Sequence, residues 1–399
     1  MSLVALDQAL DAILPGLPVI AAAETVPLAA AVGRVLAEDI RARSPYPAFD
    51  QSAMDGYALR GDGADGAVLP VIGRLTAGAR PETFHEWGAV RIFTGAPIPS
   101  GFDRVVMQEH CSTAEGKVEI RTWPPAGEHL RRSGEDMARD AVVLRAGTIL
   151  GPREVAVAAA VGHDAVAVRG RPRVGVLSTG DELAPAGAAL QPGQIHDSNR
   201  PMLLAALAAL LVPARDLGQV PDRAGVMAET LSRAAEAHNL VLTSGGVSVG
   251  EEDRLAEAIE AAGGRVTLYR LAIRPGKPLA VGRIGDCAIL GLPGNAFSSF
   301  MSFNLVGRPV LARIMGGSAP RLPCFAASLA FPRPGRLPRT DYVPVRVIGT
   351  DDAGRPLLDR AGPPGSARLS PILLADGVAE IPTTDEPVRF IPVSALVGL

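Results

Sequence analysis

Residues 173–182 read RVGVLSTGDE, and residues 240–253 read LVLTSGGVSVGEED. Each stretch begins with a short run rich in Val and Leu, the pattern of a buried strand, and continues into a glycine-containing acidic loop. Strands and helices that alternate are typical of βαβ units. We therefore predict a doubly wound, mostly parallel α/β domain with helices near residues 201–211, 223–238, 252–262 and 297–315, and further strands near 214–217, 266–270 and 287–292.

The sequence on either side of this domain has a different pattern. Apolar residues share one helical face at the N-terminus, and a second helix is expected from Pro152 to Val161. Residues 45–139 and 319–399 instead alternate short apolar runs with turn residues, and the second of these segments contains no convincing helix. We predict four domains: a helical linker domain (1–44 and 140–171), a β-rich domain (45–139), the α/β domain (172–318) and a small β-barrel (319–399).

Composition excludes several classes of protein. The net charge is −3 and no long run of Lys or Arg occurs, so we expect no nucleic-acid partner. The 3 cysteines are far apart and form no CxxC pair, which argues against disulfides and a zinc site. The start of the chain carries Asp7 and Asp11 instead of a basic segment, and the apolar run 202–212 is too short for a bilayer. We therefore expect a cytoplasmic protein without a membrane span.

Four loops that follow predicted strands have the composition of a ligand site. Ligands of open α/β sheets bind beyond the carboxyl ends of the strands, and glycine lets backbone N–H groups approach an anion. Carboxylates in these loops, and Arg270, Arg274 and Lys277 after another strand, suit a phosphate ligand that carries a divalent metal. The alternative is that the glycines only shape turns. Four such loops at one edge of the sheet argue against that alternative. The loops are 178–182, 218–222, 244–253 and 293–295.

Two glycine motifs have simpler explanations. Residues 246–250 match the G-x-S-x-G nucleophile elbow, but every histidine precedes Ser248, whereas that fold needs a later one. Residues 61–66 match G-x-G-x-x-G, but a strand-like run follows where the dinucleotide motif requires a helix. We expect a turn at residues 61–66.

Nine segments, in order, resemble the molybdopterin molybdenumtransferase family, which includes the E domain of gephyrin. Physical reasoning alone would assign the β-rich segments to turns with apolar anchors. The resemblance covers nearly the whole chain, with Gly365-Ser366 and residues 375–377 as weaker barrel motifs. The segments are SAMDGYA (52–58), RIFTGAPIPSG (91–101), VVMQE (105–109), GED (134–136), STGDEL (178–183), SNRP (198–201), TSGGVSVGEED (243–253), RPGKP (274–278) and GLPGN (291–295).

The resemblance implies an elongated homodimer with a shared active site. Each subunit would have a helical linker domain, a β-rich lasso domain, an α/β domain and a C-terminal β-barrel. The implied reaction takes adenylated molybdopterin and molybdate, needs Mg²⁺, releases AMP and leaves molybdenum on the dithiolene sulfurs. A molybdopterin adenylyltransferase is an implied partner.

The resemblance also implies roles for individual residues. Asp253, Glu182, Asp55 and Thr94 would be catalytic, and Asp253 and Glu182 would bind the metal. Arg274 and Lys277 look like anion contacts, Pro293 like part of a molybdate wall, and Asp136 like a lasso contribution. The complete set implied to bind the substrate is Ser178, Thr179, Gly180, Asp222, Ser244, Gly245, Gly246, Ser248, Arg274, Lys277, Pro293, Gly294, Asn295 and Asp136.

The chain departs from the family pattern at several positions. Ala296 replaces a proline after GLPGN, Gln51 replaces an asparagine, and Pro344 stands at an often basic position. Arg270 and Arg274 stand where lysine is common. Two other functions compete: a molybdopterin adenylyltransferase, which needs neither lasso nor barrel, and a non-catalytic scaffold like gephyrin, against which the retained carboxylates argue.

Overall fold

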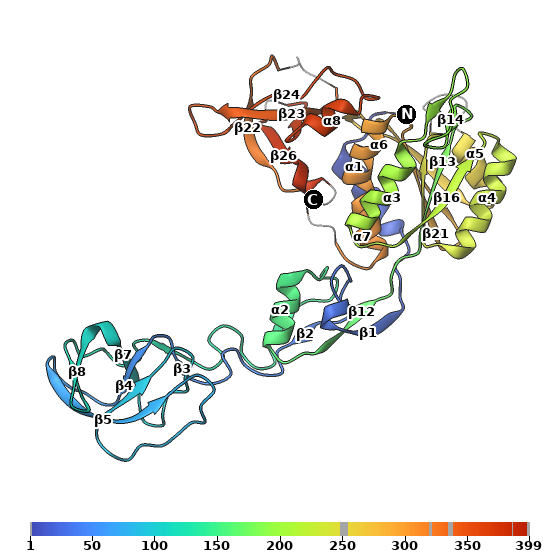
Figure 1. The fold of residues 1–399 in the computed structure, drawn as a ribbon. Coiled ribbons are helices and arrows are strands. Elements are labelled where there is room, and N and C mark those ends of the chain that lie inside the picture. The colour runs from blue at the N-terminus through green and yellow to red at the C-terminus, as the bar shows by residue number, and fades with distance from the viewer. Residues whose placement is uncertain (1, 248–253, 319–320, 334–337, 385, 397–399) are drawn as a thin grey trace.

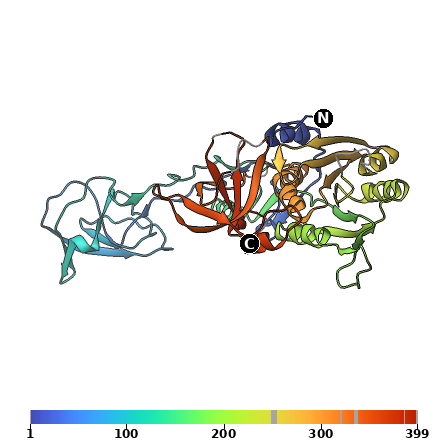
Figure 2. The same cartoon turned by 90° about the horizontal axis from the view of Figure 1, so that it is seen from above.

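The computed structural model describes residues 2–247, 254–318, 321–333, 338–384 and 386–396. The chain forms an elongated molecule with the lasso domain at one end, and with the α/β domain and the C-terminal barrel at the other (Figure 1). The segment that carries α2 (Pro152–Ala160) lies between these ends. A view from above shows the same separation (Figure 2).

The central sheet has six strands in the order β16-β13-β17-β21-β20-β18. Neighbouring strands among the first four are parallel, and β20 pairs antiparallel with both β21 and β18. This arrangement confirms the predicted mostly parallel sheet. The strands are β13 (Val174–Thr179), β16 (Ala214–Val220), β17 (Leu240–Ser244), β18 (Arg265–Arg270), β20 (Pro278–Ile284) and β21 (Cys287–Leu292).

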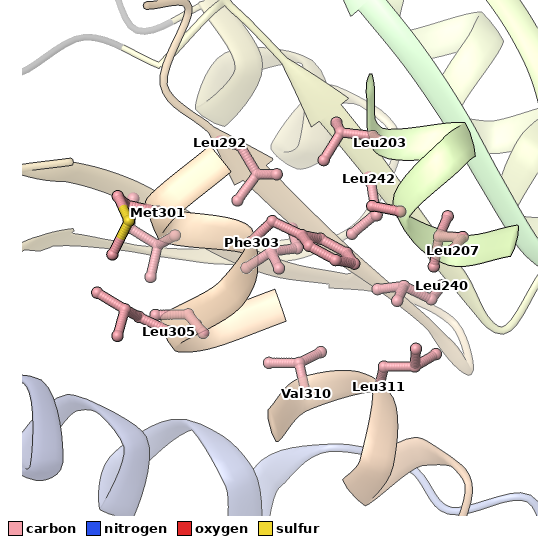
Figure 3. Close-up of a cluster of buried hydrophobic side chains, with 14 of the residues drawn as sticks. Leu203, Leu207, Leu240, Leu242, Leu292, Met301, Phe303, Leu305, Val310 and Leu311 are labelled. Atoms are coloured by element: carbon pink, nitrogen blue, oxygen red, sulfur yellow. The ribbon is translucent and has the colours of Figure 1, made fainter. Parts of the chain in front are cut away.

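Helices cover both faces of this sheet, as a doubly wound fold requires. One face is covered by α3 (Asn199–Ala209), α6 (Ala296–Ser302) and α7 (Arg308–Ile314), whose apolar residues join one buried cluster with β17 and β21 (Figure 3). The opposite face is covered by α4 (Ala224–Ala237) and α5 (Arg254–Ala261), which form a second cluster. No helix in the described part of the chain is long and apolar enough to cross a membrane.

The predicted helix 297–315 is interrupted by a π-helical segment, Phe303–Gly307. Pro309, which follows this segment, has no N–H to donate to the preceding turn, so regular α-helical bonding cannot continue through it. Phe303 is 1% exposed and packs against Gly307, where an added Cβ would lie 2.7 Å from its ring. The break therefore places an aromatic ring at the centre of the core (Figure 3).

Several strands in this domain differ from the prediction, β20 and β16 among them. Strand β20 was not expected; it forms a hairpin with β21 through the two-residue turn Gly285-Asp286, in which Gly285 has a φ of 56°. Strand β16 continues to Val220, so Gly218 and Gln219 lie in a strand and not in the predicted loop.

The N-terminal helix α1 (Leu6–Ile13) packs into the α/β core and not with α2. Val4 donates its N–H to the Arg270 carbonyl at 2.9 Å, which ties the segment before α1 to the end of β18. The linker itself holds one α-helix, α2, so its expected helical character is only partly correct. The segment also contains a short 3-10 helix, Leu28–Ala30, and two antiparallel strand pairs, β1 (Ala23–Pro27) with β12 (Ala165–Arg169) and β2 (Ile40–Arg41) with β11 (Val142–Leu144). The predicted domain boundaries stay a prediction.

The lasso domain contains a six-stranded mixed sheet in the order β7-β4-β6-β5-β9-β8. Two apolar clusters pack within this domain. Residues 61–66 precede β5 without regular structure, as expected of a turn. The strands are β4 (Gly56–Leu59), β5 (Ala67–Leu75), β6 (Ala89–Ile92), β7 (Arg104–Met107), β8 (Cys111–Ala114) and β9 (Lys117–Ile120); a smaller pair joins β3 (Gln51–Ser52) to β10 (Leu130–Arg131).

The C-terminal domain is a closed five-stranded barrel, as predicted. Its strands pair in the order β23-β24-β22-β26-β25, and β25 pairs again with β23. A short helix, α8 (Ser370–Leu374), interrupts the strands where no helix was expected. The pairing of β19 (Ile273–Arg274) with β23 joins the barrel to the α/β domain. The other strands are β22 (Phe325–Leu329), β23 (Thr340–Thr350), β24 (Pro356–Arg360), β25 (Gly377–Ile381) and β26 (Val388–Pro392).

We predict that Ala296→Pro is tolerated. Ala296 is the first residue of α6, where the N–H has no partner within the helix, and Asn295 before it has the extended backbone that proline prefers (φ −67°, ψ 130°). The free energy of unfolding, measured with urea, should change by no more than about 1 kcal/mol. Ser299→Pro is the control, because it removes the bond from the Ser299 N–H to the Asn295 carbonyl and should cost about 3 kcal/mol or more. A large loss for both variants would contradict the assignment of residue 296.

Candidate active site at the carboxyl ends of the central strands

The loops after β13 and β17 meet where the strand order reverses. From β13 the chain continues to β16, which lies on one side of β13. It then crosses to β17, which lies on the other side of β13. Such a reversal is the place where open α/β sheets bind ligands. Gly245 has a φ of 89°, and a Cβ added there would lie 2.3 Å from the Thr179 carbonyl oxygen. Only glycine fits this contact, which brings the predicted site residues Thr179, Gly245 and Gly246 together.

Asn199 connects three segments of the site. Its Nδ2 donates to Ser244 Oγ at 2.7 Å and to the Gly294 carbonyl at 2.6 Å. The residue is 7% exposed, and its Oδ1 accepts no hydrogen bond within the described structure. Asn199 thereby holds the ends of β17 and β21 at the start of α3. Asn199 lies in the SNRP segment but is not among the site residues predicted from the sequence.

Ser178 is completely buried, and its hydroxyl faces the protein interior. It donates to Asp197 Oδ2 at 2.5 Å, and Arg200 Nε donates to the same oxygen at 2.9 Å. Arg200 also binds Asp216 of β16 with an N–O distance of 2.5 Å. This network fixes the end of β13 against α3, so the Ser178 side chain supports the loop from beneath.

The described carboxylates of the site lie after β13 and β16. The Asp222 N–H donates to Asp181 Oδ1 at 3.1 Å, and Thr179 Oγ1 donates to Asp222 Oδ1 at 3.4 Å. Glu182 is exposed, and its carboxylate lies over Gly180, where an added Cβ would be 2.6 Å from Oε2.

Carboxylate oxygens are the donors that Mg²⁺ takes, so the chemistry of these groups suits the predicted metal. Within the described ranges, however, no three His, Cys, Asp or Glu side chains are grouped closely enough to hold a metal ion. The predicted site residues Asp253 and Ser248 lie outside the described residues.

Basic residues lie at the opposite end of the same sheet edge. Strand β18 runs in the same direction as β21, because each pairs antiparallel with β20. Arg274 donates from Nε to Asp341 Oδ1 of the barrel at 2.7 Å and binds the second carboxylate oxygen as well. These hydrogen bonds raise the pKa of Arg274. Lys277 is half-buried, and its ammonium has no side-chain partner in the described structure.

The barrel also contacts the predicted molybdate wall. Pro293 is buried, whereas Gly294 and Asn295 are exposed. Asn295 precedes α6 but does not cap it; its Nδ2 donates instead to Ser366 Oγ at 3.1 Å. The Phe297 N–H donates to the Ser366 carbonyl, also at 3.1 Å. One barrel residue thus holds both the wall and the start of α6.

Asp55 and Thr94 form a hydrogen-bonded couple in the lasso domain. Asp55 Oδ1 accepts the Thr94 N–H and the Thr94 hydroxyl, both at 2.8 Å. The Thr94 N–H lowers the pKa of the Asp55 carboxyl, and the hydroxyl lowers it further. Asp136 lies elsewhere, where its N–H donates to the Tyr46 carbonyl at 3.2 Å, and among the described residues no hydrogen bond or ion pair joins it to the couple. The lasso domain and the central sheet lie at opposite ends of the elongated molecule (Figure 1).

Comparison with known proteins gives concordant results. A molybdopterin molybdenumtransferase of Haemophilus influenzae is 40% identical over 316 residues, which cover 78% of this chain and 78% of that protein. Molybdopterin molybdenumtransferase 2 of Mycobacterium tuberculosis is 39% identical over 377 residues, 90% of each chain. The chain belongs to the molybdopterin molybdenumtransferase family.

Each part of the chain also matches a region of this family. Residues 4–162 match the MoeA N-terminal region (domain I and II), residues 175–313 match a probable molybdopterin binding domain, and residues 326–389 match the MoeA C-terminal region (domain IV). The crystal structure of a molybdopterin biosynthesis MoeA protein from Pyrococcus horikoshii OT3 superposes with a TM-score of 0.78. It is 29% identical and covers 98% of this chain and 100% of that chain. The resemblance inferred from the motifs is therefore confirmed, as is the fold class.

We predict that Thr94→Val raises the pKa of Asp55. The variant keeps the backbone N–H but removes the hydroxyl that donates to Asp55, so the carboxylate loses one of two bonds that favour its charged form. Titration followed by ¹³C NMR of the Asp55 carboxyl measures this pKa, and Thr94→Ser, which keeps the hydroxyl, is the control.

The same change should alter acid stability in a defined direction. A folded-state pKa below that of the unfolded chain stabilises the fold above the unfolded pKa, and this contribution is lost as pH falls through the folded pKa. As pH falls, Thr94→Val should therefore lose less free energy of unfolding than the normal protein does. An unchanged Asp55 titration would show that the hydroxyl bond is absent in solution.

Proposed function

We propose that this protein transfers molybdenum from molybdate to adenylated molybdopterin and releases AMP. Membership of the molybdopterin molybdenumtransferase family makes it a transferase of molybdenum cofactor biosynthesis. The observation that carries the finer proposal is the sheet edge, where close-packed glycine loops lie between carboxylates at one end and basic residues at the other.

The size of this edge suits an extended anionic ligand. Six strands leave five intervals of about 4.8 Å, so the carboxylates beyond β16 and the basic residues beyond β18 are roughly 24 Å apart. A pterin joined through a pyrophosphate to adenosine is a ligand of this kind. The glycine loops would offer backbone N–H groups to its phosphates, and the Lys277 ammonium would add a positive charge.

We propose that Mg²⁺ binds beside these phosphates, held by Glu182 and Asp253. The ion would neutralise phosphate charge as AMP leaves. Glu182 is exposed at the end of β13 and can turn toward a ligand above Gly180, whereas the buried Asp197 is already bonded to Ser178 and Arg200. Removal of Mg²⁺ with a chelator should stop AMP release without unfolding the protein.

We further propose that two subunits share each active site. The Asp55–Thr94 couple belongs to the lasso domain, which lies at the opposite end of the molecule from the α/β domain of its own chain (Figures 1 and 2). A two-fold dimer could bring the lasso of one subunit to the edge of its partner and would form two equivalent sites. We also propose contact with the molybdopterin adenylyltransferase, because the substrate is its adenylated product.

The direct test is an anaerobic incubation of the protein with adenylated molybdopterin, Mg²⁺ and molybdate. AMP and metal-loaded cofactor should appear together, in equal amounts. Formation of adenylated molybdopterin from molybdopterin and ATP would instead indicate an adenylyltransferase. Well-folded protein that releases no AMP would favour a scaffold.

We predict that Asp253→Ala lowers the rate of AMP release about 100- to 1000-fold, while the protein remains folded. The carboxylate would be lost from the metal and phosphate site, and one such electrostatic contact stabilises a transition state by about 3–4 kcal/mol. Glu260→Ala is the matched control, because Glu260 is an exposed carboxylate of α5. Near-normal AMP release by the Asp253 variant would exclude this role.

A subunit-mixing experiment tests the shared site. Asp55→Ala and Asp253→Ala proteins should each be inactive alone, and activity should return when the two are co-expressed. In a mixed dimer with shared sites, one site carries both defects and the other carries neither. Differential tags verify that mixed dimers form, and mixed dimers without activity would show that each site uses a single chain.

A further inference from the structure

Arg91 of β6 is held in the lasso domain by hydrogen bonds and by contacts with two aromatic rings. Its Nη1 donates to the Gly56 carbonyl at 2.8 Å, and its Nη2 donates to Gln108 Oε1 at 2.6 Å. The guanidinium carbon also lies 5.2 Å from the ring centre of Tyr57 and 4.5 Å from that of Phe93. Planar hydrogen bonding combined with stacking on aromatic rings is a property of arginine that lysine does not share.

These contacts surround the Asp55–Thr94 couple. Gly56 directly follows Asp55, and Phe93 directly precedes Thr94. Gln108, whose side chain accepts from Arg91, donates its backbone N–H to the Asp55 carbonyl at 3.0 Å. Arg91 therefore touches one neighbour of each member of the couple, and it touches the residue that binds the Asp55 backbone.

The backbone beside Asp55 has little freedom to compensate for the loss of these bonds. A Cβ added at Gly56 would lie 1.8 Å from the Val106 carbonyl oxygen, so this segment is pressed against β7. Gln108 directly follows β7 and belongs to the VVMQE segment. The proposed function gives this segment no role. Val105 and Val106 of that segment are buried and fix its place.

We propose that Arg91, supported by Gln108, is a positioning residue for the transferase reaction, which fixes the direction of the Asp55 carboxylate through the Gly56 carbonyl and the Phe93 ring. This role rests on the proposed function of Asp55. Arg91 itself is engaged with protein groups and acts through Asp55. Its positive charge also favours the charged form of that carboxylate.

Arg91→Lys tests the proposal. Lysine keeps the positive charge, but it cannot donate from two nitrogens to Gly56 and Gln108 or stack as a plane on the aromatic rings. We expect kcat for AMP release to fall about 10- to 100-fold, the effect of a misplaced reacting group, with KM within about threefold. Arg74→Lys is the matched control. The Arg74 guanidinium stacks on the same Phe93 ring at 5.0 Å but forms no hydrogen bond or ion pair within the described part of the protein, so its variant should stay within about twofold.

A double-mutant cycle separates positioning from a general structural role. If Arg91 acts through Asp55, then Arg91→Lys should cause no further loss of kcat in a protein that already carries Asp55→Asn. A structural role would make the two losses multiply, and that result would overturn the proposal. Equal losses for Arg91→Lys and Arg74→Lys would overturn it as well.

Hydrogen exchange gives a readout that does not depend on catalysis. Mass spectrometry of the peptide with Thr94 should show at least tenfold faster amide exchange in Arg91→Lys, because the Thr94 N–H donates to Asp55. The β8–β9 hairpin, residues 111–120, should be unchanged and reports overall stability. Unchanged exchange at Thr94, or faster exchange in both segments, would contradict positioning. Should the normal protein release no AMP, the proposed function would fail, whereas this exchange result would still decide whether Arg91 orders the couple.

Discussion

The contact between Gly245 and the Thr179 carbonyl is the constraint on which the candidate site depends. The two loops meet only because residue 245 has no side chain and a positive φ. Behind them, Ser178 pairs in register with Ser244, and Ser244 pairs with Leu292, so the strand ends are level. Asn199 then ties the β17 and β21 ends together from below. A ligand at this edge would meet backbone groups whose positions the sheet fixes.

The barrel fixes the other half of the same edge. Parallel pairing of β19 with β23 brings Asp341 to Arg274, and the carboxylate side chain is 6% exposed, whereas that of the arginine is 48% exposed. The partly exposed guanidinium is oriented by a buried partner, and a hydrogen-bonded carboxylate of this kind restricts how the arginine can turn. Ser366 of the barrel binds Asn295 through its hydroxyl and Phe297 of α6 through its carbonyl. The barrel is therefore structurally part of the α/β site, although the sequence separates Arg274 from Ser366 widely.

Sequence reasoning succeeded where a local pattern determines the structure. The apolar runs of β13 and β17 and the glycines after them identified the sheet and the loops at the carboxyl ends of these strands. It failed where distant segments decide. Nothing near Leu6 shows that α1 packs against the α/β core, and nothing in SNRP shows that Asn199 reaches Gly294. The π-helical break at Phe303 likewise arises from how Pro309 and Gly307 fit the core, which periodicity does not record.

In the lasso domain, hydrogen bonds orient the Asp55–Thr94 couple, whereas side chains in the core are oriented by packing. Thr94 is exposed, so no apolar core restricts the direction in which it and Asp55 point. Direction is instead set by hydrogen bonds to Asp55 Oδ1, to the Asp55 carbonyl and to the Gly56 carbonyl. Such bonds are directional, and they leave the carboxylate accessible to a ligand or to a second subunit. In the proposed dimer this couple would meet a site on another chain. Orientation before that meeting would favour association, because ordering the couple afterwards would subtract from the free energy of association.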